Sequence, residues 1–143
     1  MPRSFAAFQN MKYHESDKYN DLVKYYRYKG RVPEATRNDF EIAQRIKEKG
    51  IVGTIRVPAA KIDVSNISVV NNHAFRHGCT LEDTKKYIQN AKVSITRSKR
   101  DGLHTNFYSL DGAAYIDALG NINTIYSKNN FNKDTPKILK EVQ

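Results

Sequence analysis

The sequence predicts an α+β domain, in which helices pack against an antiparallel sheet. Two stretches in the first third have the apolar spacing of amphipathic helices, and a third helical pattern lies near residues 80–91. Residues 93–127 instead alternate between apolar and polar side chains and contain two compact turn signals. Helices combined with a strand meander in this way are typical of α+β domains.

The N-terminal third is expected to form two amphipathic helices. Residues 15–28 carry apolar side chains at helical spacing, and Gly30 follows their end. The second helix is expected to begin at Thr36, because Thr36 and Asp39 resemble a capping box with Asp in the place usually taken by Glu or Gln. Gly50 is expected to end this helix.

The middle of the chain changes to β-branched residues. Residues 51–57 are expected to form a strand that Pro58 ends, because proline offers no N–H to a sheet ladder. An irregular connection is expected up to Val70. Thr80 and Asp83 then resemble a second capping box at the start of a helix.

The last third is expected to contain four short strands in meander order, within the segments KVSITRS, NFYSL, AAYIDA and INTIYS. Asp111-Gly112 and residues 119–121 are hairpin signals. Residues 98–104, SKRDGLH, are expected to form an exposed basic loop. A terminal helix is expected from Asp134, with Pro136 near its first turn.

These elements fit one domain. We interpret residues 1–50 as an N-terminal helical segment that packs on the same domain, and residues 51–143 as its α+β core with a four- to five-stranded antiparallel sheet. A chain of 143 residues with 39% hydrophobic content can bury one modest core.

Charge and cysteine content narrow the functional classes. A formal net charge of +9 favours phosphate-rich or otherwise acidic partners. Cys79 is the single cysteine, so no internal disulfide forms. His73 and His77 have i, i+4 spacing without the carboxylate of a zinc-protease motif, so we expect neither a metal site nor a cofactor. No apolar run is long enough to span a bilayer, and we expect no membrane segment.

His73, Arg76 and His77 form the first candidate site. They crowd in front of the expected helix that begins after Thr80, and the unpaired N–H groups of a first helical turn favour an anion such as phosphate. Histidine suits proton transfer near neutral pH, and arginine suits a phosphate because its planar guanidinium stays charged. These residue types match the needs of a phosphodiesterase that acts on RNA without a metal ion. The alternative reading is a solvated loop that happens to hold two histidines.

A second candidate cluster lies in the late strands. Strand alternation places Thr124, Tyr126 and Lys128 on one face, where a hydroxyl, a phenol and an ammonium can orient a phosphate or stack a base. Tyr108 and Tyr115, on adjoining strands, extend this aromatic surface. The alternative is that Tyr115 and one of Phe107 and Tyr108 are core residues. This reading is favoured for Tyr115 and is evenly balanced for Tyr108.

Residues 52–142 resemble a known group of nucleases. The segments that carry the resemblance are VPAAKIDVS, a histidine followed by RHxxT, IQNAK, SIT, NFYS, DGAAYID and GxIxT. They look like the nuclease domains grouped as barnase–EndoU–colicin–RelE-like (BECR). More narrowly, they resemble those at the C-termini of phage minor head (MuF-type) proteins and of polymorphic bacterial toxins.

The resemblance implies metal-independent RNA cleavage through a 2′,3′-cyclic phosphate. It makes His77 the general acid or base, Arg76 the phosphate clamp and His73 the second proton-transfer group. The late strands would supply catalytic or substrate-binding groups, and the sequence departs from barnase-like enzymes in lacking an evident glutamate base. The further site residues that we predict are Thr124, Tyr108 and Ser127 for catalysis and Thr80, Tyr126, Lys128, Lys99 and Arg100 for substrate binding.

Thr124 and Ser127 need separate consideration. Strand alternation places them on opposite faces unless a bulge intervenes, so they do not carry equal weight as site residues.

Two other functions stay open. An ADP-ribosyltransferase would use Arg76, Ser94 or Thr96, and Tyr108, but its late glutamate could only be Glu141, in the expected terminal helix. A non-catalytic basic domain that binds nucleic acid or a capsid would instead shift RNA in a salt-dependent way without shortening it.

The resemblance also implies partners and a location. RNA is the expected substrate, and the sequence does not discriminate tRNA from mRNA. A cognate immunity protein and a phage capsid or longer toxin polypeptide are the other expected partners. The expected place of action is the cytoplasm of a target bacterium, reached with a phage particle or as a secreted toxin.

Overall fold

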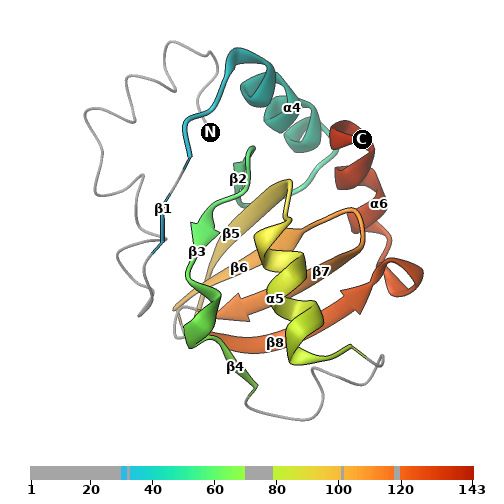
Figure 1. Cartoon of the computed structure of the whole chain (residues 1–143). Coiled ribbons are helices and arrows are strands. Elements are labelled where there is room, and N and C mark those ends of the chain that lie inside the picture. The colour runs from blue at the N-terminus through green and yellow to red at the C-terminus, as the bar shows by residue number, and fades with distance from the viewer. Residues whose placement is uncertain (1–29, 32, 70–78, 101, 118–119) are drawn as a thin grey trace.

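The centre of the molecule is an antiparallel sheet of five strands, in the order β2-β5-β6-β7-β8 (Figure 1). A short sixth strand, β4, pairs with β8 in parallel at the edge. The strands are β2 Thr54–Arg56, β4 Ser68–Val69, β5 Val93–Lys99, β6 Gly102–Tyr108, β7 Gly112–Asp117 and β8 Asn121–Ser127. The molecule is therefore an α+β domain, as the sequence predicts.

The structure, a computed structural model, describes residues 30–31, 33–69, 79–100, 102–117 and 120–143. The helix expected at residues 15–28 lies outside these ranges, and so does the histidine-rich segment that comes after Val70 in the sequence.

The two helices expected from capping boxes are confirmed. They are α4 (Arg37–Glu48) and α5 (Leu81–Gln89), and each begins after a threonine whose hydroxyl accepts a hydrogen bond from the backbone N–H of an aspartate three residues later. In both cases the aspartate side chain accepts a hydrogen bond from the threonine N–H in return. Aspartate therefore serves in the capping box where glutamate is more usual.

The terminal helix is also confirmed, as α6 (Asp134–Leu139). It continues into a short 3-10 helix, η4 (Lys140–Val142). Glu141 in η4 binds two cations of α4 and its C-cap, with Oε1 lying 3.0 Å from Arg45 Nε and Oε2 lying 2.6 Å from Lys49 Nζ. These ion pairs join the C-terminal end of the chain to α4.

The predicted meander is present, but its first hairpin is tighter than expected. β5 and β6 stay paired from Val93↔Tyr108 to Lys99↔Gly102. The expected loop at residues 98–104 is therefore wrong, because most of this segment belongs to the two strands. The pairing of β5 with β6 continues to Lys99 and Gly102, next to the tip of the hairpin.

The chain before α5 is more ordered than the expected irregular connection. It contains β3 (Lys61–Ile62), the 3-10 helix η1 (Val64–Asn66) and β4. β3 pairs with β1 (Gly30–Arg31) in a separate two-stranded sheet. β2 is shorter than the expected strand at residues 51–57, and it ends two residues before Pro58.

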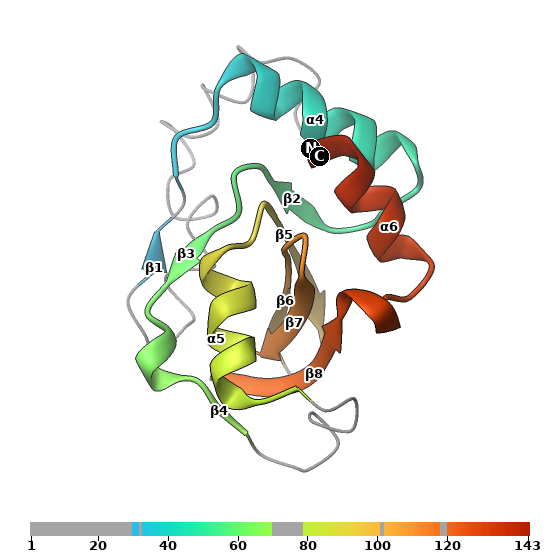
Figure 2. The ribbon, with the colours of Figure 1, turned by 45° about the vertical axis from the view of Figure 1, so that its right-hand side comes forward.

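The central sheet separates two apolar clusters. α5 lies across one face, where its Ile88 packs with Phe107, Ala114 and Ile125 of the strands. α4 and α6 pack against the other face at one end of the strands, where Ile46 and other residues of the two helices meet the sheet (Figure 2). Each fully buried side chain of the size of Ile or Phe contributes about 1.5–3 kcal/mol to stability.

Candidate functional site on the open sheet face

The first predicted site cannot be placed. His73, Arg76 and His77 lie outside the described residues, and the described chain resumes at Cys79. Their catalytic roles therefore stay predictions. The next described element along the chain is α5, whose N-terminus comes shortly after His77 in the sequence.

Thr80 is the N-cap of α5. Its hydroxyl accepts a hydrogen bond from the Asp83 N–H at 3.1 Å, so this side chain is engaged in helix capping. Cys79, just before it, is buried, and burial raises the pKa of its thiol. The thiol also interacts with Tyr87 of α5 and with the backbone of Ser127. Cys79 and Ser127 therefore lie near each other, on the face of the sheet that α5 covers.

β8 carries a bulge that decides where its side chains lie. The register with β7 shifts between Tyr115↔Thr124 and Ile116↔Ile122, so Asn123 is the extra residue. Ile122 and Ile125 both enter the cluster beneath α5 as a result. We define the open face as the face of the central sheet opposite α5, of which α4 and α6 cover one end.

Thr124 and Tyr126 lie on the open face. They stand opposite Tyr115 and Ala113, which belong to the cluster on that face, and directly paired residues share a face. Ser127 stands opposite Gly112, whose missing side chain would point at Tyr87 of α5.

The expectation that Thr124 and Ser127 lie on opposite faces is therefore confirmed, since the bulge precedes both residues. The expectation that Lys128 extends the β8 face is wrong. β8 ends at Ser127, and Lys128 begins the 3-10 helix η3 (Lys128–Asn130). The Lys128 N–H donates a hydrogen bond to the carbonyl of Asp111, which turns the chain out of the sheet.

Three tyrosines line the open face across β6, β7 and β8. The ring centroids of Tyr108 and Tyr115 lie 6.0 Å apart, and those of Tyr115 and Tyr126 lie 5.7 Å apart, both with edge-to-face geometry. Such pairs are favourable because the edge of one ring meets the negative face of the other. Tyr115 and Tyr126 are only partly buried, so part of their aromatic surface is accessible.

Tyr108 is the buried member of this set, with 2% of its surface exposed. Burial raises the pKa of its phenol, and Tyr115 and Asn106 lie near enough to affect it. Asn106 Nδ2 donates a hydrogen bond to the Tyr108 hydroxyl at 3.1 Å. The Tyr108 ring thus belongs to the core, and its hydroxyl is hydrogen-bonded to the Asn106 side chain on the open face.

A polar row crosses the open face beside the tyrosines. We define it as Arg97 of β5, His104 of β6, Asp117 of β7 and Asn123 of the β8 bulge. Arg97, His104 and Asp117 are register partners, and Asn123 Nδ2 lies 3.0 Å from His104 Nδ1. The row thus places a cation, an imidazole, a carboxylate and an amide side by side.

The polar row is the part of the site that the sequence analysis missed. His104 falls within the segment expected to be a loop, which concealed its place on a strand. The alternation of β6 would have placed His104 on the face of Asn106 and Tyr108. Its contact with Asn123 needs the bulge, and nothing in the sequence of β8 marks that bulge.

Lys99 and Arg100 lie at the tip of the β5–β6 hairpin and are exposed. Lys99 is two residues beyond Arg97, so both side chains start from the same side of β5. Arg97 Nε donates a hydrogen bond of 2.6 Å to the carbonyl of Val52, which fixes the direction of its guanidinium. The hairpin therefore carries positive charge next to the polar row.

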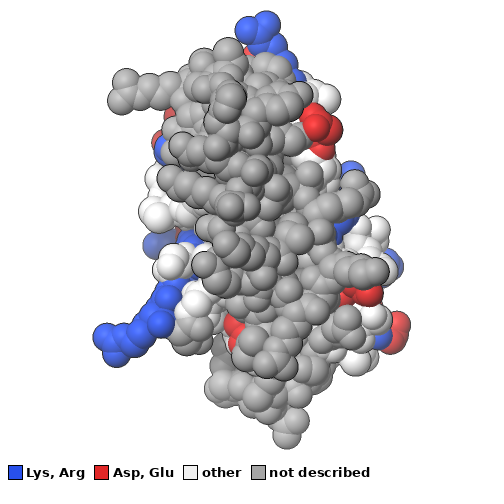
Figure 3. All heavy atoms as spheres, turned by 90° about the vertical axis from the view of Figure 1, so that its left-hand side faces the viewer, with Lys and Arg blue, Asp and Glu red and all other residues white. Residues whose placement is uncertain are grey.

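Figure 3 shows one side of the molecule by charge. Lys and Arg side chains and Asp and Glu side chains both appear at the margins of this side, interspersed with each other.

The residues expected for ADP-ribosyl transfer have structural partners. Ser94 is fully buried, and its Oγ accepts a hydrogen bond from the N–H of Ala60 at 2.9 Å. Thr96 is also buried, with its hydroxyl 3.0 Å from that of Thr105. Glu141 lies in the ion pairs with α4, and its pKa is lowered mainly by hydrogen bonds from Lys49 and then Arg45. Ser94 and Thr96 lie on the face that α5 covers, away from Tyr108.

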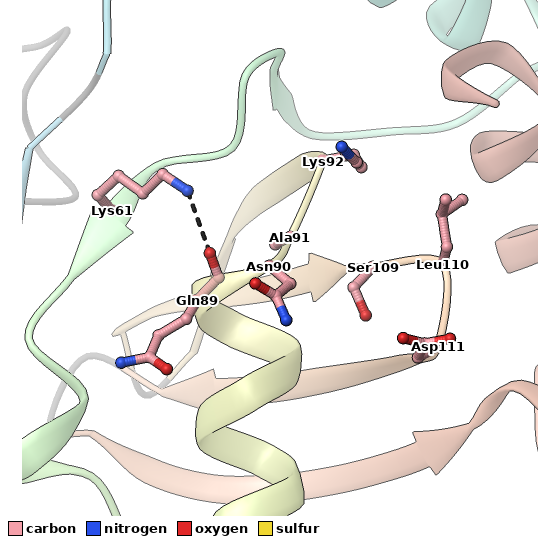
Figure 4. Close-up of a pocket in the computed structure, with 8 residues that line it drawn as sticks. All are labelled: Lys61, Gln89, Asn90, Ala91, Lys92, Ser109, Leu110 and Asp111. Carbon is pink, nitrogen blue, oxygen red and sulfur yellow. Dashed lines mark hydrogen bonds between the residues drawn. The ribbon is translucent and has the colours of Figure 1, made fainter.

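A surface pocket of about 400 Å³ lies elsewhere, at the C-terminal end of α5. It is lined by Lys61, Gln89, Asn90, Ala91, Lys92, Ser109, Leu110 and Asp111 (Figure 4). Lys61 Nζ donates a hydrogen bond of 3.2 Å to the carbonyl of Gln89 at one side of it. The pocket contains none of the predicted site residues.

Among the described residues, no group of three or more His, Cys, Asp and Glu side chains is arranged to hold a metal ion. Within the same ranges, no helix has the length and apolar character needed to cross a bilayer.

Comparison with known proteins gives no relative. The chain matches no protein-family model, no curated protein and no solved structure.

Proposed function

We propose that this chain is a metal-independent endoribonuclease that binds single-stranded RNA across the open face. The observation that carries the proposal is the position of two partly exposed tyrosines, Tyr115 and Tyr126, beside the polar row. Aromatic side chains stack on bases of any sequence, and nearby cations bind the phosphates between them. The net charge of +9 supports binding to a polyanion.

The proposed reaction is an attack of the 2′-oxygen on the adjacent phosphorus. The P–O2′ bond forms, the P–O5′ bond breaks, and a 2′,3′-cyclic phosphate results. The 2′-hydroxyl proton must go to a base, and the leaving 5′-oxygen must receive a proton. The sequence resemblance assigns these transfers to His77 and His73 and assigns the phosphate to Arg76.

The experiment is incubation of the purified chain with total bacterial RNA in EDTA, followed by gel and end-group analysis. Fragments that end in a cyclic phosphate are expected from the unmodified chain and not from His77→Ala. His14→Ala is the matched control, because this histidine belongs to no predicted site, and full cleavage is expected from it. Equal cleavage by His77→Ala would remove His77 from the mechanism.

A non-catalytic RNA-binding domain is the second candidate, and the same open face favours it. Such a domain would shift RNA on a native gel and release it as salt increases, without shortening it. Intact RNA after prolonged incubation, together with salt-dependent binding, would establish this function and exclude the nuclease.

The partners depend on the nuclease proposal. An enzyme that cleaves cellular RNA needs an inhibitor in the cell that makes it, so a cognate immunity protein belongs to the proposal. Its place of action would be the cytoplasm of a target bacterium. The test is to express the chain in bacteria with and without a candidate immunity protein and to measure growth. Rescue of growth by that protein is the expected result.

A further inference from the structure

The side chain of Asn132 joins the start of α6 to the open face. Its Oδ1 accepts hydrogen bonds from the Asp134 N–H at 3.1 Å, from the Thr135 N–H at 3.0 Å and from Thr135 Oγ1 at 2.9 Å. Only the oxygen of an amide side chain can accept from backbone N–H groups, so the orientation of this amide is determined. The nitrogen is therefore the atom that faces Tyr115, and Nδ2 lies 3.1 Å from the Tyr115 hydroxyl oxygen.

This contact fixes the role of the Tyr115 hydroxyl. An amide nitrogen only donates hydrogen bonds, so Asn132 donates and the Tyr115 oxygen accepts. A phenol also carries one proton of its own, which cannot be given to a group that is itself donating. The Tyr115 proton is therefore available to an acceptor outside this pair.

The neighbouring Tyr108 donates to Tyr115 as well. Its hydroxyl oxygen accepts a hydrogen bond from Asn106 Nδ2 at 3.1 Å. The pKa of Tyr108 is raised mainly by burial, and a hydrogen bond with the Tyr115 side chain raises it further. A hydrogen bond raises the pKa of the phenol that gives its proton to the bond, so Tyr108 is the donor of this pair. Asn132 and Tyr108 thus both donate to the Tyr115 oxygen, which leaves the Tyr115 proton for a third group.

The Tyr115 hydroxyl lies where a ligand can reach it. Tyr115 is only partly buried, and Asn132 is exposed. The exposed Lys133 follows Asn132 directly in the chain, so a cationic side chain begins next to this contact. A hydroxyl donor in this setting suits a negatively charged oxygen, because hydrogen bonds to ionised acceptors are about twice as strong as those between neutral groups.

We propose that the Tyr115 hydroxyl donates a hydrogen bond to a non-bridging phosphate oxygen of the bound RNA, and that Asn132 is the positioning residue that keeps its proton available. The inference rests on the proposed function, because its ligand is the RNA on the open face. Tyr115 then has two tasks: its ring extends the aromatic surface, and its hydroxyl binds the backbone between stacked bases. Asn132 ties this donor to α6, since the same amide accepts the N–H groups of the first turn of that helix.

The first test removes the hydroxyl alone. Tyr115→Phe keeps the ring, and Asn132 is exposed, so its amide can donate to water instead. Single-stranded 2′-O-methyl RNA lacks the attacking hydroxyl, so its dissociation constant reports binding without cleavage. We expect Tyr115→Phe to weaken this binding by about 10- to 100-fold, the usual value of a hydrogen bond to a charged group. Equal affinity of Tyr115→Phe and the unmodified chain would overturn the proposal.

The second test reverses the hydrogen bond. Asn132→Asp keeps an oxygen for the first turn of α6, but a carboxylate only accepts, so the Tyr115 hydroxyl is expected to donate to it. Binding of the same RNA should then weaken at least as much as in Tyr115→Phe. Asn129→Asp is the matched control for the added negative charge, because Asn129 is exposed on η3 and belongs to no predicted site. Its effect should stay within about fivefold.

The double variant separates positioning from charge. Once Tyr115→Phe has removed the hydroxyl, Asn132→Asp has no proton to withdraw, so it should add only the loss seen in Asn129→Asp. Strictly additive losses from Tyr115→Phe and Asn132→Asp would show that the two residues act independently, which overturns the positioning role. Thermal unfolding of each variant checks that its fold is retained.

The same measurements keep this inference distinct from the proposed function. If the unmodified chain binds the 2′-O-methyl RNA but cleaves no RNA, the nuclease proposal fails, and the affinities of Tyr115→Phe and Asn132→Asp still decide the donor role. An unmodified chain that cleaves RNA but loses no affinity in either variant keeps its function and loses this inference. An unmodified chain that binds no RNA overturns both.

Discussion

Gly112 lies directly beneath the ring of Tyr87, so that α5 rests on β7 at a position where the strand has no side chain. A Cβ atom built on Gly112 would overlap three atoms of that ring. The backbone of Gly112 is not in the left-handed region, so its conformation does not require glycine. The glycine is needed because a side chain here would prevent the close approach of α5 and β7.

Replacing Gly112 with alanine is therefore expected to destabilise the protein by about 1–3 kcal/mol, the usual cost of overpacking a core. Chemical denaturation of the purified variant measures this cost. The penalty should shrink in a Tyr87→Ala background, because the overlapping ring is then absent. A penalty that is the same in both backgrounds would contradict the contact.

Ser94→Ala is expected to cost about 1–3 kcal/mol of stability. The Ser94 hydroxyl accepts the N–H of Ala60 in the buried core, and its loss leaves that N–H without this acceptor. Ser98→Ala is the matched control on the same strand, because Ser98 is exposed, and its effect should stay within about 0.5 kcal/mol. Similar effects of the two changes would show that the Ala60 hydrogen bond is unimportant.

Glu141→Gln is expected to lower the melting temperature at neutral pH. Lys49 and Arg45 lower the pKa of Glu141, so its carboxylate contributes stability above the pKa of the unfolded chain, and this contribution is lost as pH falls through the folded pKa. Melting curves from pH 7 downward should therefore begin to converge for the two proteins below about pH 4.3, the ordinary pKa of glutamate, and should coincide below the lowered folded pKa.

Glu48→Gln provides the control for that series, because Glu48 is an exposed carboxylate at the end of α4. Its melting temperature should track that of the unmodified protein throughout. A constant difference between Glu141→Gln and the unmodified protein at every pH would mean that the ion pairs do not cause the effect.

Tyr126→Ala is expected to weaken binding of single-stranded 2′-O-methyl RNA by about 1–3 kcal/mol, the usual value of one stacked base. Tyr126→Phe keeps the ring and should bind almost as well as the unmodified chain. Fluorescence anisotropy with a labelled oligonucleotide measures both. Unchanged affinity in Tyr126→Ala would show that the RNA does not bind to Tyr126 on the open face.

The fold was predictable where local chemistry determines it. Thr36 and Thr80 marked two helix starts through their capping boxes, and apolar alternation marked the four strands of the meander. The tightness of the β5–β6 hairpin was missed because Lys, Arg and Gly in residues 98–104 resemble a loop, although the ladder continues to Lys99 and Gly102.

The candidate site was less predictable, because its geometry depends on contacts between distant strands. Alternation within β8 correctly placed Thr124 and Tyr126 together and separated them from Ser127. It could not place His104 next to Asn123, since this contact needs the register of three strands and one bulge.

The bulge in β8 also makes Asn123 a residue whose removal would leave the core pattern intact. Without it, Ile122 and Ile125 would stand two residues apart, and strict alternation would keep both on the α5 side. The amide that meets His104 would be lost at the same time. A single-codon deletion at this position is therefore expected to spare the packing beneath α5 and to alter the opposite surface, so the extra residue serves that surface and not the core.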